Sequence, residues 1–138
     1  MSRQIPATAN SSSSGSENQV RVLAPFSPSA SQKPVTAFCE AEGEKGAKTR
    51  TWFSLPDEEV FAVAGLWRDT AEWGPAYSMV MTEACHHVQG VHDRMPVILP
   101  RSSWADWLDG APDAARLLCQ PYPSDMVVTR TSDPWVKR

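Results

Sequence analysis

Three polar residues, His92, Asp93 and Arg94, stand together immediately before the apolar run 95–99 (MPVIL). A histidine beside an arginine can act on a phosphate-bearing substrate, because imidazole serves as a general acid or base and guanidinium binds phosphate oxygens. Pro96 would stiffen the segment and hold His92 in a defined direction. Solvated turn residues explain such a cluster about equally well, so the residues alone leave both interpretations open.

Glu40 follows a strand-like apolar run at residues 35–39 (VTAFC). A carboxylate at the end of a buried strand loses hydration, which raises its pKa and suits it to proton transfer. Glu42 and Glu44 flank a glycine further on, and acidic residues in such a loop most often face solvent. Glu40 is therefore the candidate acid or base in this stretch.

Lys48 and Arg50 belong to a basic cluster that could contact phosphates, although nearby acidic residues offset its charge. Trp67 and Trp73 flank a predicted loop and could stack on unpaired nucleic-acid bases. For each aromatic residue, burial in the core is the commoner explanation. The candidate nucleic-acid-binding residues are Lys48, Arg50, Trp67 and Arg94.

The three cysteines, Cys39, Cys85 and Cys119, are odd in number and form no CxxC pair. This argues against a disulfide framework or a four-cysteine zinc site and favours reduced thiols. The sequence Cys85-His86-His87 invites a metal hypothesis, but adjacent residues on a helix point in different directions and rarely ligate one ion together. We therefore expect no metal and no other cofactor.

A change of composition divides the chain near residue 35. Residues 1–34 hold nine Ser and four Pro, and such a segment cannot bury enough apolar surface to offset its ordering entropy. We expect a disordered Ser/Pro-rich tail at 1–34 and one domain at 35–138. Strands are predicted at 49–55, 60–67, 77–82, 95–99 and 126–131, and short helices at 83–88, 103–108 and 113–119.

The predicted elements indicate an α+β domain that is mostly β with short helices. The strands at 49–55 and 60–67 are expected to pair as a hairpin around a tight turn, and the continuous apolar character of 60–67 is typical of a strand covered on both faces. Ser103 is expected to open the helix that follows it as part of a capping box. Pro112 suits the first turn of the next helix.

The overall charge of −3 does not favour nucleic-acid binding through a generally basic surface. The first 34 residues carry Arg3, Arg21 and Lys33 against Glu17, a net of +2, so the remainder carries −5. Any DNA binding by the domain must use a local basic groove. The chain lacks both an apolar run of about 18 residues and an apolar signal core, so we expect a cytoplasmic protein with no membrane partner.

Several motifs, taken in order, resemble those of one family, the SOS-response-associated peptidases. Residues 38–40 (FCE) resemble its Phe-Tyr-Glu segment, 61–67 (FAVAGLW) its FAFAGLW strand, 92–99 (HDRMPVIL) its signature almost letter for letter, and 104–108 (WADWL) the helix that follows. The resemblance covers roughly residues 35–131. It implies a partial domain of this kind, mostly β, with a positively charged groove for single-stranded DNA.

In that family, removal of Met1 exposes a cysteine whose amine attacks the ring-opened aldehyde of an abasic site, and whose thiol then closes a thiazolidine ring. By resemblance, Glu40 matches the catalytic glutamate and His92 the catalytic histidine, while Arg94 matches a structural or phosphate-holding position. The implied partner is single-stranded DNA with abasic sites, and the implied context is DNA damage.

The chain departs from the family pattern at its start, where the second residue is Ser2 and residues 1–34 do not resemble the family's front half. A hydroxyl is far less acidic than a thiol, so we expect covalent capture to be weak or absent. The alternative is an inactive truncated remnant or a non-covalent DNA-binding module.

A domain without its front half would leave strand edges and apolar faces uncovered, above all at Trp52, Phe61 and Trp67. We expect marginal stability of the isolated chain and self-association through the uncovered strands.

Overall fold

The computed structural model describes residues 29–136, a range dominated by strands. The strands are β1 (Ser29–Val35), β2 (Phe38–Glu42), β3 (Thr49–Ser54), β4 (Phe61–Thr70), β5 (Gly74–Met79), β6 (Met81–Glu83), β7 (Arg94–Pro96), β8 (Ile98–Leu99) and β9 (Val127–Pro134). The helical segments are the 3-10 turn η2 (Arg101–Ser103), α2 (Trp104–Asp109) and α3 (Pro112–Leu117). The predicted α+β class, mostly β with short helices, is confirmed.

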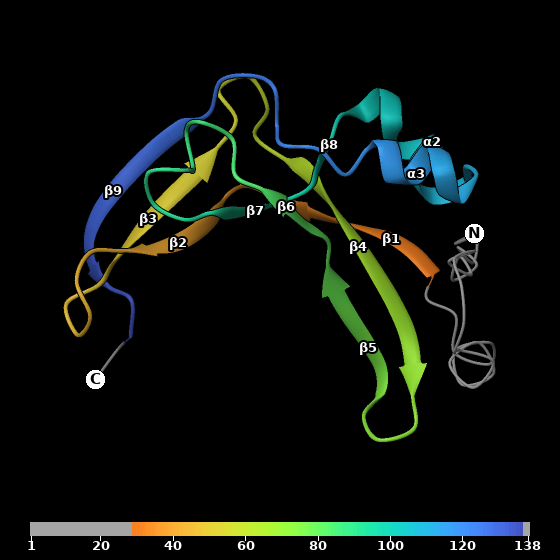
Figure 1. Ribbon diagram of the computed structural model, residues 1–138, viewed down its shortest axis with the longest axis horizontal. Coiled ribbons are helices and arrows are strands. Elements are labelled where there is room, and N and C mark those ends of the chain that lie inside the picture. The colour runs from red at the N-terminus through yellow and green to blue at the C-terminus, as the bar shows by residue number, and fades with distance from the viewer. Residues whose placement is uncertain (1–28, 137–138) are drawn as a thin grey trace, which may run out of the picture.

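The strands of the described range pair antiparallel in three sheets. The first sheet has the order β1-β4-β5, with β8 also paired to β4, and the second has the order β2-β3-β9. The third consists of β6 and β7 alone. In Figure 1 the β2-β3-β9 sheet lies on one side of the molecule, the β4–β5 hairpin extends away on the other, and β6 and β7 lie between them.

Strand β4 is buried on both faces over its first half. Phe61 and Val63 belong to one hydrophobic cluster together with Phe53 of β3, whereas Ala62 and Ala64 belong to a second cluster. Successive side chains of a strand point to opposite faces, so a continuous apolar run is what a doubly covered strand requires. The prediction of a strand buried on both sides is confirmed for this part of β4.

The predicted hairpin between 49–55 and 60–67 is wrong. Strand β3 pairs with β2 and β9, whereas β4 pairs with β1, β5 and β8. The connection at 56–59 carries the chain from one sheet into the other. Turn-forming residues such as Pro56 and Asp57 suit both a hairpin turn within one sheet and a connection between two sheets. The local sequence therefore does not distinguish a hairpin from a crossing between sheets.

Strand β1 begins at Ser29, inside the segment that we predicted to be a disordered tail, so that prediction is wrong for residues 29–34. The strand runs antiparallel to β4, from Ser29 opposite Trp67 to Val35 opposite Phe61. Its polar composition resembles a loop, but pairing with a buried strand outweighs such a local preference. The rest of the predicted tail, residues 1–28, lies outside the described residues.

Two predicted strands are each interrupted where the backbone changes partners. The strand predicted at 77–82 is divided at Val80, and the strand predicted at 95–99 is divided at Val97. The Val80 amide donates to the Ala64 carbonyl, the Val97 amide to the Val80 carbonyl, and the Ala64 amide to the Val97 carbonyl. These bonds join the β6–β7 pair to β4 and fix its position.

The one or two helical turns predicted at 83–88 lie further along the chain, and they form no regular helix. Glu83 ends β6, and residues 86–91 form a turn segment in which the amides of Val88 and Gln89 both donate to the Cys85 carbonyl. The Val88 carbonyl accepts in the same way from the amides of Val91 and His92, so two successive turns lead to the candidate site.

Helices α2 and α3 correspond to the two helices predicted after residue 100 and cover the second hydrophobic cluster. Pro112 occupies the first turn of α3 as predicted, but Ser103 makes no side-chain capping bond, so the predicted capping box is wrong. Trp107 of α2 is 3% exposed, and its ring nitrogen donates to the Ser31 carbonyl of β1 at 2.8 Å. No helix in the described range is long and apolar enough to cross a membrane.

The exposed large apolar side chains of the first sheet lie on the β4–β5 hairpin and its turn. Phe61, which we expected to be uncovered, is buried, and Trp52 is half-buried. The exposed residues of the hairpin are Trp67, Trp73, Tyr77 and Met79. Within this sheet the uncovered apolar surface therefore follows the hairpin, from Met79 opposite Gly65 to Trp73 in the turn.

The substitution Trp107→Ala should lower the free energy of unfolding by roughly 3–5 kcal/mol, because it removes a buried aromatic side chain and its hydrogen bond to Ser31. Urea unfolding followed by circular dichroism measures the difference. Trp73→Ala, the same change at a position that is 77% exposed, should alter stability by about 0.5 kcal/mol or less. Equal effects of the two substitutions would show that Trp107 does not dock α2 on β1.

Candidate functional site

Glu40 lies on the face of β2 that packs toward the hydrophobic core. In the register of β2 with β3, Phe38 is opposite Phe53 and Glu40 is opposite Thr51, and directly opposed residues share one face of a sheet. Phe53 and Thr51 are fully buried, and Phe38 stacks on Phe53 with ring centroids 5.1 Å apart. The Glu40 side chain is consequently half-buried at the margin of the core.

The two acidic residues of β2 have pKa values shifted in opposite directions. Burial raises the pKa of the Glu40 carboxyl, and the charge of nearby His92 lowers it by a smaller amount. The hydrogen bond from Thr51 lowers the pKa of Glu42; partial burial opposes this shift, and Arg130 adds to it. The two carboxyl groups therefore differ in acidity, with Glu40 the weaker acid and Glu42 the stronger.

Glu42 owes its lowered pKa to two donors. The Thr51 hydroxyl donates to its carboxylate at 2.5 Å, and Arg130 Nε lies 2.9 Å and 3.1 Å from its two oxygens. Our expectation that Glu42 faces solvent in a loop is therefore wrong, because it lies in β2 with its side chain 28% exposed. Its carboxylate ties β2 to β9 across the middle strand β3.

His92 is held by the backbone on both sides of its ring. Its amide donates to the Val88 carbonyl at 2.9 Å. The ring Nδ1 lies 3.0 Å from both the amide nitrogen and the carbonyl oxygen of Arg94, and 3.4 Å from the Asp93 carboxylate. Without its proton Nδ1 accepts from the amide, and with it Nδ1 donates to the carbonyl, which leaves Nε2 as the ring nitrogen available to a ligand.

The structure brings Glu40 of β2 and His92, in the segment that leads into β7, close enough for the charge of His92 to lower the pKa of Glu40. Arg94 follows His92 by two residues and begins β7, where it is exposed and donates through Nη2 to the Met81 carbonyl at 3.4 Å. The candidate group is therefore Glu40 with His92, and the backbone of Arg94 is joined to the His92 ring.

An open pocket of about 640 Å³ lies beside this group and is bordered by the β6–β7 pair. Its lining residues are Thr82, Glu83, Ala84, Gln89, Asp93 and Arg94. Neither Glu40 nor His92 lines it, so the pocket adjoins the acid–base pair instead of enclosing it. Arg94 is the candidate site residue on its border.

The remaining candidate residues do not join this group. Arg50 is opposite Ala41, which places it on the face of the sheet opposite to Glu40. Lys48 is exposed before β3 and borders a separate pocket of about 750 Å³, where its carbonyl accepts from the Trp135 amide. Trp67 is 36% exposed and belongs to the β1-β4-β5 sheet.

Sequence reasoning missed Thr51 and Arg130. The period-two alternation of β3 puts Thr51 on the same face as Phe53, so its burial could have been inferred from the pattern. Nothing in the sequence pairs β9 with β3, and that pairing brings Arg130 opposite Thr51. A contact between distant strands of this kind carries no local signal.

The chain is similar both to a family model and to individual proteins of known name. The family model described as SOS response associated peptidase (SRAP) matches residues 30–137. The abasic site processing proteins YoqW and YoaM of Bacillus subtilis (strain 168) are 36% and 35% identical to this chain over 78 residues. Each match covers 51% of this chain but only 35% and 34% of those proteins, so the chain spans about a third of their length.

Two solved structures are similar in fold. A crystal structure of a protein from Bacteroides thetaiotaomicron matches with a TM-score of 0.64 at 22% identity, over 73% of this chain and 48% of the other. One from Bordetella bronchiseptica matches with a TM-score of 0.66 at 28% identity, over 74% and 54%. The described strands therefore correspond to about half of each of these larger folds.

Glu42→Gln should destabilise the chain by about 1 kcal/mol near neutral pH, because it weakens charge-assisted hydrogen bonds from Thr51 and Arg130. A lowered pKa contributes stability that is present above the unfolded value and lost as pH falls through the folded value. The destabilisation should therefore fade as pH is lowered past the ordinary value of 4.5. Urea unfolding across this range measures it, and a difference independent of pH would contradict the assignment.

Glu40→Gln should change the free energy of unfolding in the opposite direction to Glu42→Gln. A raised carboxyl pKa means that the folded state disfavours the ionised form, so stability is lost as pH rises through the folded pKa. Near neutral pH the glutamine variant should be at least as stable as the parent chain, and the difference should vanish below the ordinary value of 4.5. Destabilisation by Glu40→Gln at neutral pH would show that the carboxylate has a stabilising partner.

Proposed function

Since the family model spans residues 30–137, this chain belongs to the SOS response associated peptidase (SRAP) family, and we propose that it binds single-stranded DNA at abasic sites with weak or absent covalent capture. The observation that carries the proposal is the meeting of Glu40 and His92 beside Arg94. The names of the relatives YoqW and YoaM, abasic site processing proteins, point to the same substrate.

An abasic site presents chemistry that suits this pair. The sugar opens to an aldehyde when its anomeric hydroxyl loses a proton and its ring oxygen gains one. Glu40, whose raised pKa favours the protonated form, can supply a proton, and the available Nε2 of His92 can accept one. The two transfers involve different oxygens of one sugar, so they need two groups, and these residues come from separate segments, β2 and the loop before β7.

Arg94 would supply the phosphate contact. Its guanidinium is exposed at the border of the pocket, where it can reach a DNA backbone without disrupting the core. Glu83 lies opposite Arg94 in the β6–β7 ladder and reduces the local positive charge. We therefore expect modest affinity with a clear dependence on salt.

The covalent step is where this chain would differ from the family pattern. An amine and an aldehyde condense to an imine with loss of water, and a neighbouring thiol stabilises the product by ring closure. Position 2 holds Ser2, whose hydroxyl forms such a ring far less readily than a thiol does. Any imine formed by this chain should revert by hydrolysis, which leaves non-covalent recognition as the principal activity.

The first test is a denaturing gel of the full chain incubated with single-stranded DNA that carries one abasic site. We expect no heat-stable adduct with this DNA or with intact DNA, and trapping of a transient imine by borohydride is the most that the unmodified chain should show. Ser2→Cys is the control for a restored thiol. A heat-stable adduct from the unmodified chain would mean that another nucleophile performs the capture.

Non-covalent binding is tested by fluorescence anisotropy on the same DNA. Arg94→Ala should weaken binding about fivefold, the equivalent of about 1 kcal/mol for one phosphate contact, and should reduce the salt slope by about 1. The matched control is Arg116→Ala, which removes an exposed arginine on α3. If both substitutions weaken binding equally, the interaction follows total charge and the proposed site is wrong.

A further inference from the structure

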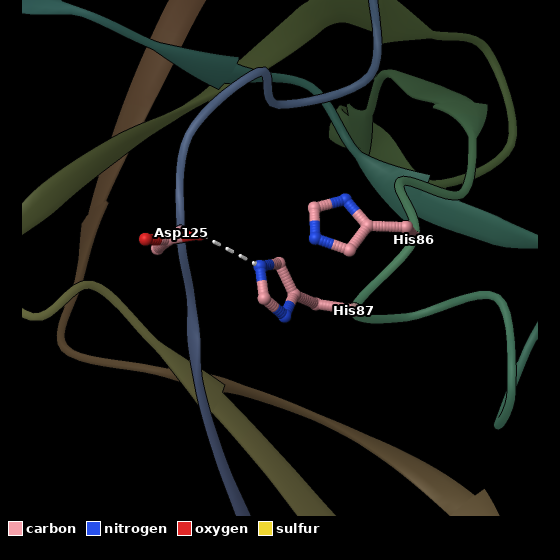
Figure 2. A group of neighbouring side chains, drawn as sticks. All are labelled: His86, His87 and Asp125. Atoms are coloured by element: carbon pink, nitrogen blue, oxygen red, sulfur yellow. Dashed lines mark hydrogen bonds and ion pairs between the residues drawn. The ribbon is translucent and has the colours of Figure 1, made fainter.

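A second group of potential ligands lies outside the Glu40–His92 pair. His86, His87 and Asp125 place their ligand atoms within 4.8 Å of one another. His87 Nε2 lies 3.3 Å from the Asp125 carboxylate, and the two histidine rings have centroids 3.8 Å apart. Figure 2 shows both rings projecting from the turn toward the segment that carries Asp125.

The reason for expecting no metal here does not hold in the folded chain. It assumed that His86 and His87 lie on a helix, where adjacent side chains diverge. They instead begin the turn segment 86–91, in which the Cys85 and Val88 carbonyls each accept two amides but no regular helix forms. The turn allows both imidazoles to project toward the same neighbouring segment (Figure 2).

Buried residues hold both parts of the group in place. Cys85, which precedes the histidines, lies with its sulfur 3.7 Å from the sulfur of Met126, which follows Asp125. Both residues are buried, as is Val88 on the other side of His87. The side chains at the surface are therefore attached to backbone that the core already positions, and little ordering is needed to bring them to one ion.

We propose that His86, His87 and Asp125 bind a divalent transition-metal ion, with Zn²⁺ as the best match. Ligand atoms at about 2.0–2.1 Å from a tetrahedral zinc ion lie about 3.3 Å apart, the separation of His87 Nε2 and the Asp125 oxygen. Two imidazoles and one carboxylate suit zinc, copper or nickel better than magnesium or calcium, which prefer oxygen ligands.

The exposure of the three side chains fits this assignment. Asp125 is 89% exposed and His87 is 23% exposed, so an ion can enter from solvent, and a ligand atom of the exposed His86 lies within 4.8 Å of theirs. Water completes the fourth position. The bound ion links the turn that precedes His92 to the segment that leads into β9, two parts of the chain otherwise joined by the Cys85–Met126 contact.

The test is calorimetric titration of the full, tag-free chain with Zn²⁺ after treatment with a chelator. One ion should bind per chain, and Zn²⁺ should raise the melting temperature. His87→Ala and Asp125→Asn should each weaken binding by about tenfold or more. The control His92→Gln removes the remaining histidine of the three in the chain and should bind Zn²⁺ as the parent does.

Each result decides the proposal. Circular dichroism of the metal-free variants confirms that they are folded, as expected for substitutions of side chains that lie at the surface. Absence of binding by the parent chain would overturn the site and leave His87 and Asp125 as an ordinary surface ion pair. Unchanged binding by Asp125→Asn, or equal loss with His92→Gln, would overturn it in favour of unspecific chelation by histidine.

Discussion

Strand β4 contributes side chains to two hydrophobic clusters, one on each of its faces, and the remaining elements are arranged to cover both faces. Phe61 and Val63 pack on one side, and Ala62 and Ala64 on the other. Burying a large apolar side chain contributes roughly 1.5–3 kcal/mol, so exposing either face would remove a large part of a domain's typical net stability of about 5–15 kcal/mol. The β2-β3-β9 sheet and helices α2 and α3 are held in place by the same requirement.

The segment that carries the candidate site follows this arrangement. Met95 belongs to the first cluster and Val97 to the second, while the Val97 backbone bonds to both Val80 and Ala64. His92 and Arg94 are therefore attached to residues that cannot shift without disturbing both clusters. Since Phe53 of β3 shares the first cluster with Met95, the same packing places β2 and Glu40 beside them.

The sequence was sufficient for the fold class and for most strand positions, and it singled out Glu40 and His92 as candidates. Those inferences rest on local alternation and on motifs whose order along the chain resembles a family. It was not sufficient for strand pairing, because β1 with β4 and β3 with β9 are contacts between distant segments. It also did not distinguish the turn segment at 86–91 from a short helix, because the two have similar local composition.

The distinct behaviour of two carboxylates on one strand shows why pairing matters for chemistry. Thr51 and Arg130 stand in the row of residues opposite Glu40, yet both direct their donors to Glu42. Glu42 consequently stays ionised and ties the strands together, whereas Glu40 is left with burial and the charge of His92. An acid that can hold a proton near its partner histidine thus arises from the unequal sharing of two donors, which neither acid's local sequence reveals.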